Sequence, residues 1–214
     1  MTSLVCEPAP TGKMKYRKFH DISVSVFVAS EFACFTEPLH RIERVSYPCP
    51  TPCAAQGILK SIHWKPEMEY GVTRIDVIKP GRLVNVPTIE RKSPQDAGLS
   101  VTTIRSNLIL NDVAYVIHAF IKVTNVPGHS RATAIKHKTI FDRRVKKSQC
   151  HKTPHMGLSQ FCVSEFREPL PTDNPIKKSQ NFGVMLHSID WETSLPRTYC
   201  ANMINGVILV GDLD

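Results

Sequence analysis

Lys136 and His137 stand side by side within the most basic stretch of the chain. A histidine has a reference pKa of about 6.5, so it can exchange protons near neutral pH, and the lysine supplies a positive charge. These residue types suit metal-free cleavage of RNA, which needs proton transfer and a cation beside the phosphorane. Lys-His pairs are common, so the spacing alone fits a solvent-facing pair on a helix as well.

The segment 131–152 carries almost the whole net charge of the chain. Its cations are opposed by a single acidic residue, Asp142, which leaves a net charge of +7 out of +8 for the whole chain. The eight cations are Arg131, Lys136, Lys138, Arg143, Arg144, Lys146, Lys147 and Lys152. Such a localised basic block predicts a polyanionic partner, most often nucleic acid, and the alternative is a solvated lysine-rich helix face.

Length and composition indicate a globular protein without a membrane span. The chain has 214 residues and 42% hydrophobic residues, which fits one large domain or one domain with a small appendage. No run of 18 apolar residues is present, and residues 1–13 lack the apolar core of a signal peptide, so we expect a cytoplasmic protein. The seven cysteines are irregularly spaced and are interpreted as small hydrophobic residues, so no metal or cofactor is predicted.

Alternating and helical patterns predict the elements that position Lys136 and His137. Thr51 and Pro52 are typical of a helix start, and Trp64 and Pro66 end that helix. A second helix is predicted over 133–147, with Lys136, Arg143 and Lys147 on one face and Phe141 and Val145 facing the core. Strands are expected at 22–28, 72–78, 113–123, 160–165, 184–190 and 207–210, loop at 85–100, and a Pro-rich connector at 167–178.

The resulting β-α-β-β-α-β order, followed by extra strands, predicts an α+β protein of the ferredoxin-like class, an arrangement that RNA-recognition domains (RRM) also use. We divide the chain into a flexible leader (1–13), a ferredoxin-like domain (14–165) and a C-terminal β subdomain (166–214).

Four blocks of sequence resemble one known family. The most specific block covers 31–66 and includes Glu-Phe-Ala-Cys-Phe-Thr-Glu-Pro at 31–38 and Ile-His-Trp-Lys-Pro at 62–66. It is followed by 136–144, by 149–157, and by 183–191 with 205–208. This arrangement resembles the CRISPR-associated Cas family five proteins of the subtype I-C (Dvulg) variety, which belong to the RAMP superfamily of endoribonucleases.

The resemblance implies a ferredoxin-like fold of the RAMP type with a small C-terminal antiparallel β subdomain, and a specific activity and set of partners. Members of this family cut CRISPR precursor RNA at the 3′ base of the repeat hairpin without metal, and then stay on the 5′ handle of the mature guide RNA. They do so as a subunit of the type I-C surveillance complex, beside its backbone and large subunits. The catalytic residues of the family match Tyr47, Lys136 and His137 here, and Tyr47 needs a nearby cation, such as Lys136, to act as a base.

RNA binding is expected from basic side chains in both halves of the predicted domain: Arg41, Arg44, Arg131, Lys138, Arg143, Arg144, Lys146 and Lys147. Phe141 and Phe161 are candidates for base stacking, although Phe141 is expected to face the core. Glu37, His155, residues 85–92 and residues 157–160 depart from the family pattern. Two alternatives are therefore kept: a non-catalytic subunit that binds the guide RNA handle, and a generic RNA-binding domain of ribosomal type.

Overall fold

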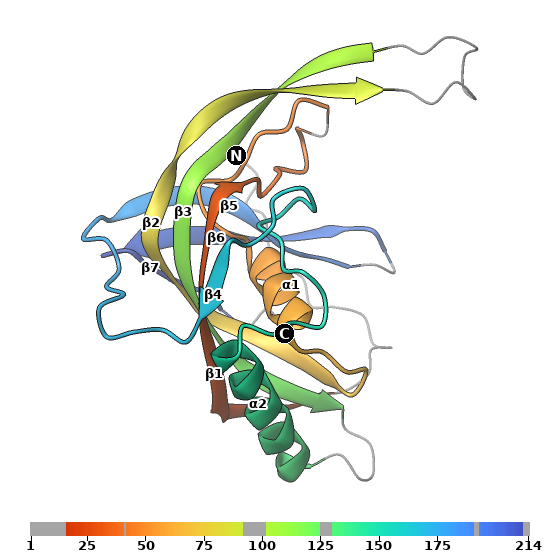
Figure 1. The fold of residues 1–214 in the computed structure, drawn as a ribbon, viewed down its shortest axis with the longest axis vertical. Coiled ribbons are helices and arrows are strands. Elements are labelled where there is room, and N and C mark those ends of the chain that lie inside the picture. Colours follow the sequence, from red (N-terminus) through yellow and green to blue (C-terminus); the bar gives the residue numbers. More distant parts are fainter. Residues whose placement is uncertain (1–15, 41, 92–101, 125–129, 191–192, 212–214) are drawn as a thin grey trace, which may run out of the picture.

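The computed structural model describes residues 16–40, 42–91, 102–124, 130–190 and 193–211, which form a seven-stranded sheet and two helices. The strands are β1 (Tyr16–Ala33), β2 (Met68–Arg91), β3 (Thr102–Thr124), β4 (Glu165–Arg167), β5 (Gln180–Ile189), β6 (Pro196–Ile204) and β7 (Val207–Leu209). The helices are α1 (Pro52–Ile62) and α2 (Arg131–Lys146). Figure 1 shows both helices on one side of the sheet, while β2 and β3 extend beyond them as a curved hairpin.

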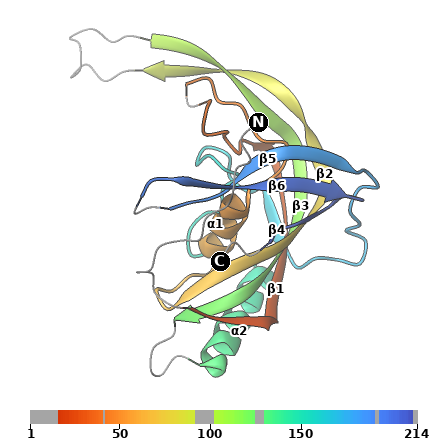
Figure 2. The same ribbon diagram turned by 180° about the vertical axis from the view of Figure 1, so that it is seen from behind.

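The first four strands confirm the predicted ferredoxin-like arrangement. The sheet has the order β4-β1-β3-β2-β7-β6-β5, and every pair of neighbours is antiparallel. Its β4-β1-β3-β2 half, with α1 and α2 as the two crossovers, is the fold expected from the β-α-β-β-α-β order. The same sheet continues through β7, β6 and β5, and Figure 2, which views the molecule from behind, shows β5 and β6 side by side.

The hydrophobic core lies between the helices and one face of the sheet. The alternating residues of β3 that were predicted to face the core do so, from Val113 and Tyr115 to Val123. Phe141 and Val145 of α2 pack into the same core, as predicted, and Phe141 stacks at a tilt on Tyr70 with ring centroids 5.9 Å apart. The core therefore fixes the rotation of α2 and directs its opposite face outward.

Local sequence signals explain where the helices begin and end. The Thr51 hydroxyl accepts a hydrogen bond from the Ala54 backbone N–H at 3.3 Å, which is the predicted N-cap, and α1 ends at Ile62. At α2 the Ser130 backbone N–H donates to the Thr133 hydroxyl at 3.3 Å, so the helix starts two residues earlier than predicted. None of the described helices is long and apolar enough to cross a membrane.

Two predictions of strands and loops were wrong, and one strand was missed. Residues 85–91, predicted as loop, continue β2, because their backbone pairs with β3 and Pro87 lies where β2 has no second neighbour. Residues 160–164 form turns rather than a strand, since the N–H groups of Phe161 and Val163 bond to nearby loop carbonyls at Leu158 and Pro154. Strand β6 was not predicted at all.

The fold does not decide where the predicted domains begin and end. The leader 1–13 lies outside the described residues. The boundary between 165 and 166 falls inside β4, and β7 joins β2 in the same sheet. The division into a ferredoxin-like domain and a C-terminal β subdomain therefore stays a prediction.

Candidate nucleic-acid interface and catalytic site

His137 lies in a buried cluster with a second histidine and a glutamate. The residue is 1% exposed, and its Nδ1 is 3.0 Å from Nε2 of His63, which follows the last residue of α1. On its other side, His137 Nε2 lies 3.2 Å from Glu67 Oε1, which is close enough for an ion pair but not aligned as a hydrogen bond. The Tyr70 hydroxyl donates to the His63 carbonyl at 2.7 Å and holds this end of the cluster.

The surroundings of the two histidines favour their neutral forms. Burial lowers the pKa of His63 to about 4, with further lowering by the charges of His137, Arg144 and Lys65. Burial also lowers the pKa of His137, although Glu67 opposes this change. Because Glu67 faces Nε2 of His137, we assign the proton to that nitrogen, so that His63 Nε2–H donates to His137 Nδ1. His63 Nδ1 is then a buried acceptor without a hydrogen-bond partner among the described residues.

This burial predicts an acid-sensitive fold. The pKa of His63 is lower in the folded protein than the unfolded value of about 6.5, so the unfolded chain binds a proton first as the pH falls. Stability is fully present above pH 6.5 and is lost as the pH falls toward 4. By linkage His63 removes about 2 kcal/mol of the unfolding free energy between pH 8 and pH 5. Urea unfolding of the wild type and of His63→Gln, which keeps a donor for His137, measures this difference.

The comparison of the wild type with His63→Gln contains its own control. All other titratable groups, including Glu67, Lys65, Arg144 and Lys136, are common to both proteins. The wild type should therefore lose stability more steeply than His63→Gln on acidification, whatever the stability of the variant at pH 8. Parallel curves for the two proteins would contradict a depressed pKa at His63.

Tyr47 lies at the other end of α1, next to the loop that leads into the helix. It is half-buried against the core, and its backbone N–H donates to the Phe35 carbonyl at 2.8 Å. Burial raises the pKa of its phenol, the Leu186 backbone N–H acts as a hydrogen-bond donor that lowers it, and Glu37 raises it further. The expected assistance of a cation is not seen in these shifts, so Tyr47 keeps its proton and is suited to donate a hydrogen bond.

The structure does not gather the three predicted catalytic residues into one contact network. His137 is joined to α1 just after Ile62, whereas Tyr47 lies near Cys53 at the start of the same helix. A helix of 11 residues is about 16 Å long. Lys136 is exposed on α2, next to His137, and within the described residues no contact joins either of them to Tyr47. The catalytic assignment therefore stays a prediction.

The eight cations of the segment 131–152 fall into two groups in the structure. Four are engaged within the protein: Arg131 with Asp21, Lys138 with Asp142 at 3.0 Å, Lys146 with Glu168 at 3.6 Å, and Arg144 with the Ile62 carbonyl at 2.6 Å. The other four, Lys136, Arg143, Lys147 and Lys152, are exposed and have no ion pair among the described residues. Lys136, Arg143 and Lys147 share one face of α2, as predicted; these three are called the basic face below.

The remaining predicted RNA contacts are less uniform. Arg41 lies outside the described residues. Arg44 is half-buried, and its backbone N–H donates to Asn107 Oδ1 at 2.9 Å. Phe161 packs on Phe32 with ring centroids 6.2 Å apart and is partly buried. Phe141 is fully buried and presents no ring face for base stacking, whereas Phe161 is partly exposed and its stacking role stays a prediction.

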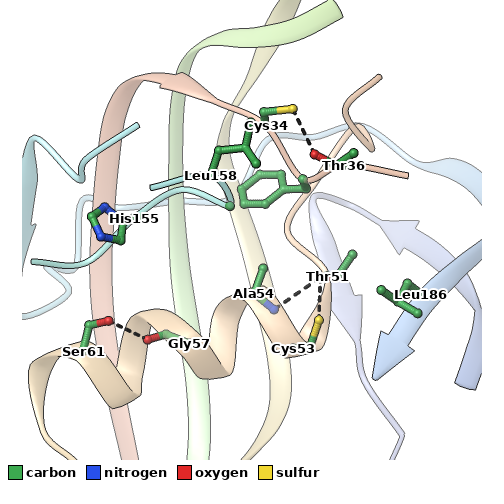
Figure 3. A pocket seen from close by; sticks show the side chains of 12 residues that line it. Cys34, Thr36, Thr51, Cys53, Ala54, Gly57, Ser61, His155, Leu158 and Leu186 are labelled. Carbon is green, nitrogen blue, oxygen red and sulfur yellow. Dashed lines mark hydrogen bonds between the residues drawn. The ribbon is translucent and has the colours of Figure 1, made fainter. Parts of the chain in front are cut away.

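A pocket of about 410 Å³ lies along α1, between this helix and the loop 155–158 (Figure 3). Cys53 and Leu186, which both act on the pKa of Tyr47, line one end, and Ser61 and His155 line the other. Within the described part of the chain, no three His, Cys, Asp or Glu side chains are grouped so that they could hold a metal ion. Cys49, as predicted for a small hydrophobic residue, is fully buried, with its Sγ 3.8 Å from Met185 Sδ.

Sequence reasoning missed His63 and Glu67 as partners of His137. Both lie within or beside the block Ile-His-Trp-Lys-Pro, which was used only to identify the family. A signal was present, because His63 follows the buried residue Leu59 by four positions, directly after the end of α1, and so continues the buried side of that helix. A buried polar side chain needs a partner, and that requirement points to a second polar group nearby.

Comparison with known proteins gives a consistent result. A family model described as CRISPR-associated protein (Cas_Cas5) matches residues 24–210. A protein of Mannheimia succiniciproducens named CRISPR pre-crRNA endoribonuclease Cas5d is 35% identical over 210 residues, which cover 86% of this chain and 93% of that protein. A protein of Thermus thermophilus with the same name is 38% identical over 150 residues, covering 64% of this chain and 61% of that protein.

Two solved structures have a similar fold. One is described as a CRISPR-associated protein, with a TM-score of 0.67, 23% identity, and coverage of 94% of this chain and 96% of that chain. The other is a functionally uncharacterized protein of Streptococcus mutans, with a TM-score of 0.63, 21% identity, and coverage of 89% and 93%. At these identities the likeness supports the fold alone.

Proposed function

Because the chain belongs to the Cas5 family of CRISPR-associated proteins, we propose that it is an endoribonuclease that cuts CRISPR precursor RNA within the repeat hairpin without metal. After cutting, it stays on the 5′ handle of the mature guide RNA as a subunit of the type I-C surveillance complex, beside the backbone and large subunits. The observation that carries this proposal is the 35% identity, over 93% of its length, to a protein named as a pre-crRNA endoribonuclease.

In this proposal the basic face of α2 holds the RNA backbone next to the reacting group. Lys136 stabilises the charge that develops on the phosphorane, and the neighbouring His137 exchanges a proton. Glu67, with 24% of its side chain exposed, lies against Nε2 of the buried His137. An RNA phosphate, which is also an anion, has to take the place of this carboxylate before His137 Nε2 can reach the RNA.

Tyr47 has a separate task in this proposal. Its phenol keeps its proton and lies at the other end of α1, beside the pocket. There it donates a hydrogen bond that orients the RNA strand as it leaves the basic face. In this assignment Tyr47, Lys136 and His137 contact successive parts of an RNA strand that runs along α1, and they do not all act on the reacting phosphorus.

A second function is supported by the burial of His137. In the arrangement seen here, both imidazole nitrogens face protein groups rather than solvent, as in a histidine that serves only to pack the core. The protein would then bind the handle of the guide RNA as a non-catalytic subunit. The basic face of α2 is required by both functions, so binding alone does not separate them.

Cleavage in the presence of EDTA separates the two functions. We expect the purified protein to cut the repeat RNA of its own CRISPR array in EDTA, leaving a 2′,3′-cyclic phosphate or its hydrolysis product and a 5′-hydroxyl. An RNA with a 2′-deoxy nucleotide at the cut position is the matched control and should bind but stay intact. Binding without any cleavage would favour the non-catalytic subunit, and a 3′-hydroxyl product or an absolute Mg²⁺ requirement would contradict the mechanism.

A further inference from the structure

Gly57 occupies an unusual position in the middle of α1. Glycine weakens a helix interior because it loses more backbone freedom on folding than other residues and has no side chain to pack. A close neighbour could require a glycine here, but a Cβ added to Gly57 would meet no atom within 4 Å beyond its chain neighbours and the backbone of its own helix. Packing within the protein therefore does not account for this residue.

The open space beside Gly57 is the pocket along α1. Figure 3 shows Gly57 and Ala54 on the helix at the bottom of this pocket, with His155 and Leu158 of the facing loop across from them. That loop is fixed in place, since the Cys34 backbone N–H donates to the Met156 carbonyl at 3.0 Å. Gly157, at φ +86°, packs against the Cys34 carbonyl so tightly that a Cβ would clash with it. The pocket is thus a built cavity with two ordered walls, and Gly57 keeps one of them flat.

The chemistry of the lining favours a flat ring with a polar edge. Phe35, Ala54, Leu158 and Leu186 supply apolar surface, while Thr36, Ser61 and His155 place hydrogen-bonding groups around it. The volume of about 410 Å³ lies in the range of small-ligand sites. None of the lining side chains is acidic, which permits an anionic ligand.

Two cations lie near the pocket. The backbone N–H groups of His151 and Lys152 both bond to the Ser61 carbonyl at 2.9 Å, which brings the end of the basic segment to the end of the pocket that Ser61 lines. Arg44 is close enough to Cys34, another lining residue, to act electrostatically on its thiol. We therefore expect a polyanionic strand that runs from Lys152 toward Arg44 to pass along the pocket.

We propose that this pocket receives one unstacked nucleobase of the single-stranded RNA that crosses α1. The base lies flat against Gly57 and Ala54, its edge faces the hydroxyl and imidazole groups of the rim, and its phosphates face Lys152 and Arg44. This inference rests on the proposed function, because it takes the bound polyanion to be RNA.

The test combines a pocket-filling variant with RNA that lacks single bases. In wild-type protein, one abasic position in the repeat RNA should weaken binding by about 10-fold, since a stacked base contributes substantially to single-strand affinity. Gly57→Leu fills the pocket and should weaken binding of the intact RNA by a similar factor. In this variant the abasic substitution should cause no further loss of affinity. Gly57→Ala should lose less affinity, and Gly211→Leu, at an exposed glycine that is also free of neighbours, should bind like the wild type.

A second measurement does not depend on any variant. Alkylation of Cys53, a half-buried thiol in the pocket wall, should slow several-fold when RNA is bound, while alkylation of the exposed Cys200 should not change. The pocket assignment is overturned if Cys53 is alkylated at the same rate with and without RNA. It is also overturned if every abasic site lowers the RNA affinity by the same factor in the wild type and in Gly57→Leu.

The outcome also separates this inference from the function on which it rests. If the wild type neither binds nor cuts the repeat RNA, the proposed function falls and the assignment falls with it. If the wild type binds and cuts the RNA without coupling between Gly57 and any base, the pocket assignment alone falls. Saturable binding of free nucleoside monophosphates that Gly57→Leu abolishes, with RNA binding unchanged, would overturn it in favour of a free nucleotide.

Discussion

Replacing His137 with alanine is expected to slow cleavage of the repeat RNA by roughly 10²- to 10⁴-fold while leaving its affinity for uncut RNA within several-fold. The reason is that a positioned proton-transfer group acts on the barrier to cleavage, whereas a neutral imidazole adds little to the binding of a polyanion. Single-turnover cleavage with excess protein measures the rate, and the 2′-deoxy RNA measures the affinity.

The burial of His137 makes a structural control necessary. Its replacement leaves a cavity and an unpaired His63 in the core, which costs on the order of 1–3 kcal/mol of stability. Val145→Ala is a matched control, because Val145 is also buried on α2 and has no proton to transfer. If both variants lose stability but only His137→Ala loses cleavage, the role of His137 is chemical. If His137→Ala cuts normally, the catalytic assignment taken from the family is wrong for this chain.

The elements of the fold were predictable where one face of an element is buried. The strict alternation of β3 and the apolar spacing of α1 reflect contact with a single core, so the sequence pattern alone indicated both. The comparisons also confirmed the family that the block at 31–66 indicated. Strand β6 was not predicted although every second residue faces inward, because the inward set includes Arg197 and the outward set includes Ile204, so the hydrophobic residues do not alternate.

Residues 85–91 show why a local pattern can mislead. Their polar residues and Pro87 are typical of a loop, yet long-range pairing with β3 holds them in a strand. Local propensity is a weak guide when a partner strand supplies the hydrogen bonds. The strand expected at 160–165 is reduced to Glu165 at the start of β4 for a different reason, since the N–H groups of Phe161 and Val163 bond to carbonyls of the same loop.

The site was predicted in type but not in geometry. The sequence indicated correctly that Lys136, Arg143 and Lys147 share an exposed face, because helical spacing determines this directly. It gave no indication that Arg144 would turn inward to the Ile62 carbonyl, or that His137 would pair with His63 on a different helix. Those contacts depend on how α1 and α2 pack, which no spacing within either helix specifies.

Replacing Arg143 and Lys147 together with alanine is expected to weaken RNA binding on the order of 10-fold at low salt and to flatten its salt dependence. Each lost phosphate contact removes released counterions, so the slope of log affinity against log salt should fall by about 0.7 per contact on a single strand. Titrations of 2′-deoxy repeat RNA at several salt concentrations measure both quantities.

The control for this experiment is the double variant Lys138→Ala with Lys146→Ala. It removes the same two positive charges from α2, but these lysines are already paired with Asp142 and Glu168. It should therefore keep nearly the wild-type salt slope, because general charge changes equally in both variants and only the phosphate contacts differ. Equal losses in the two double variants would mean that the overall charge of α2 attracts the RNA, and that the basic face does not hold a defined strand next to His137.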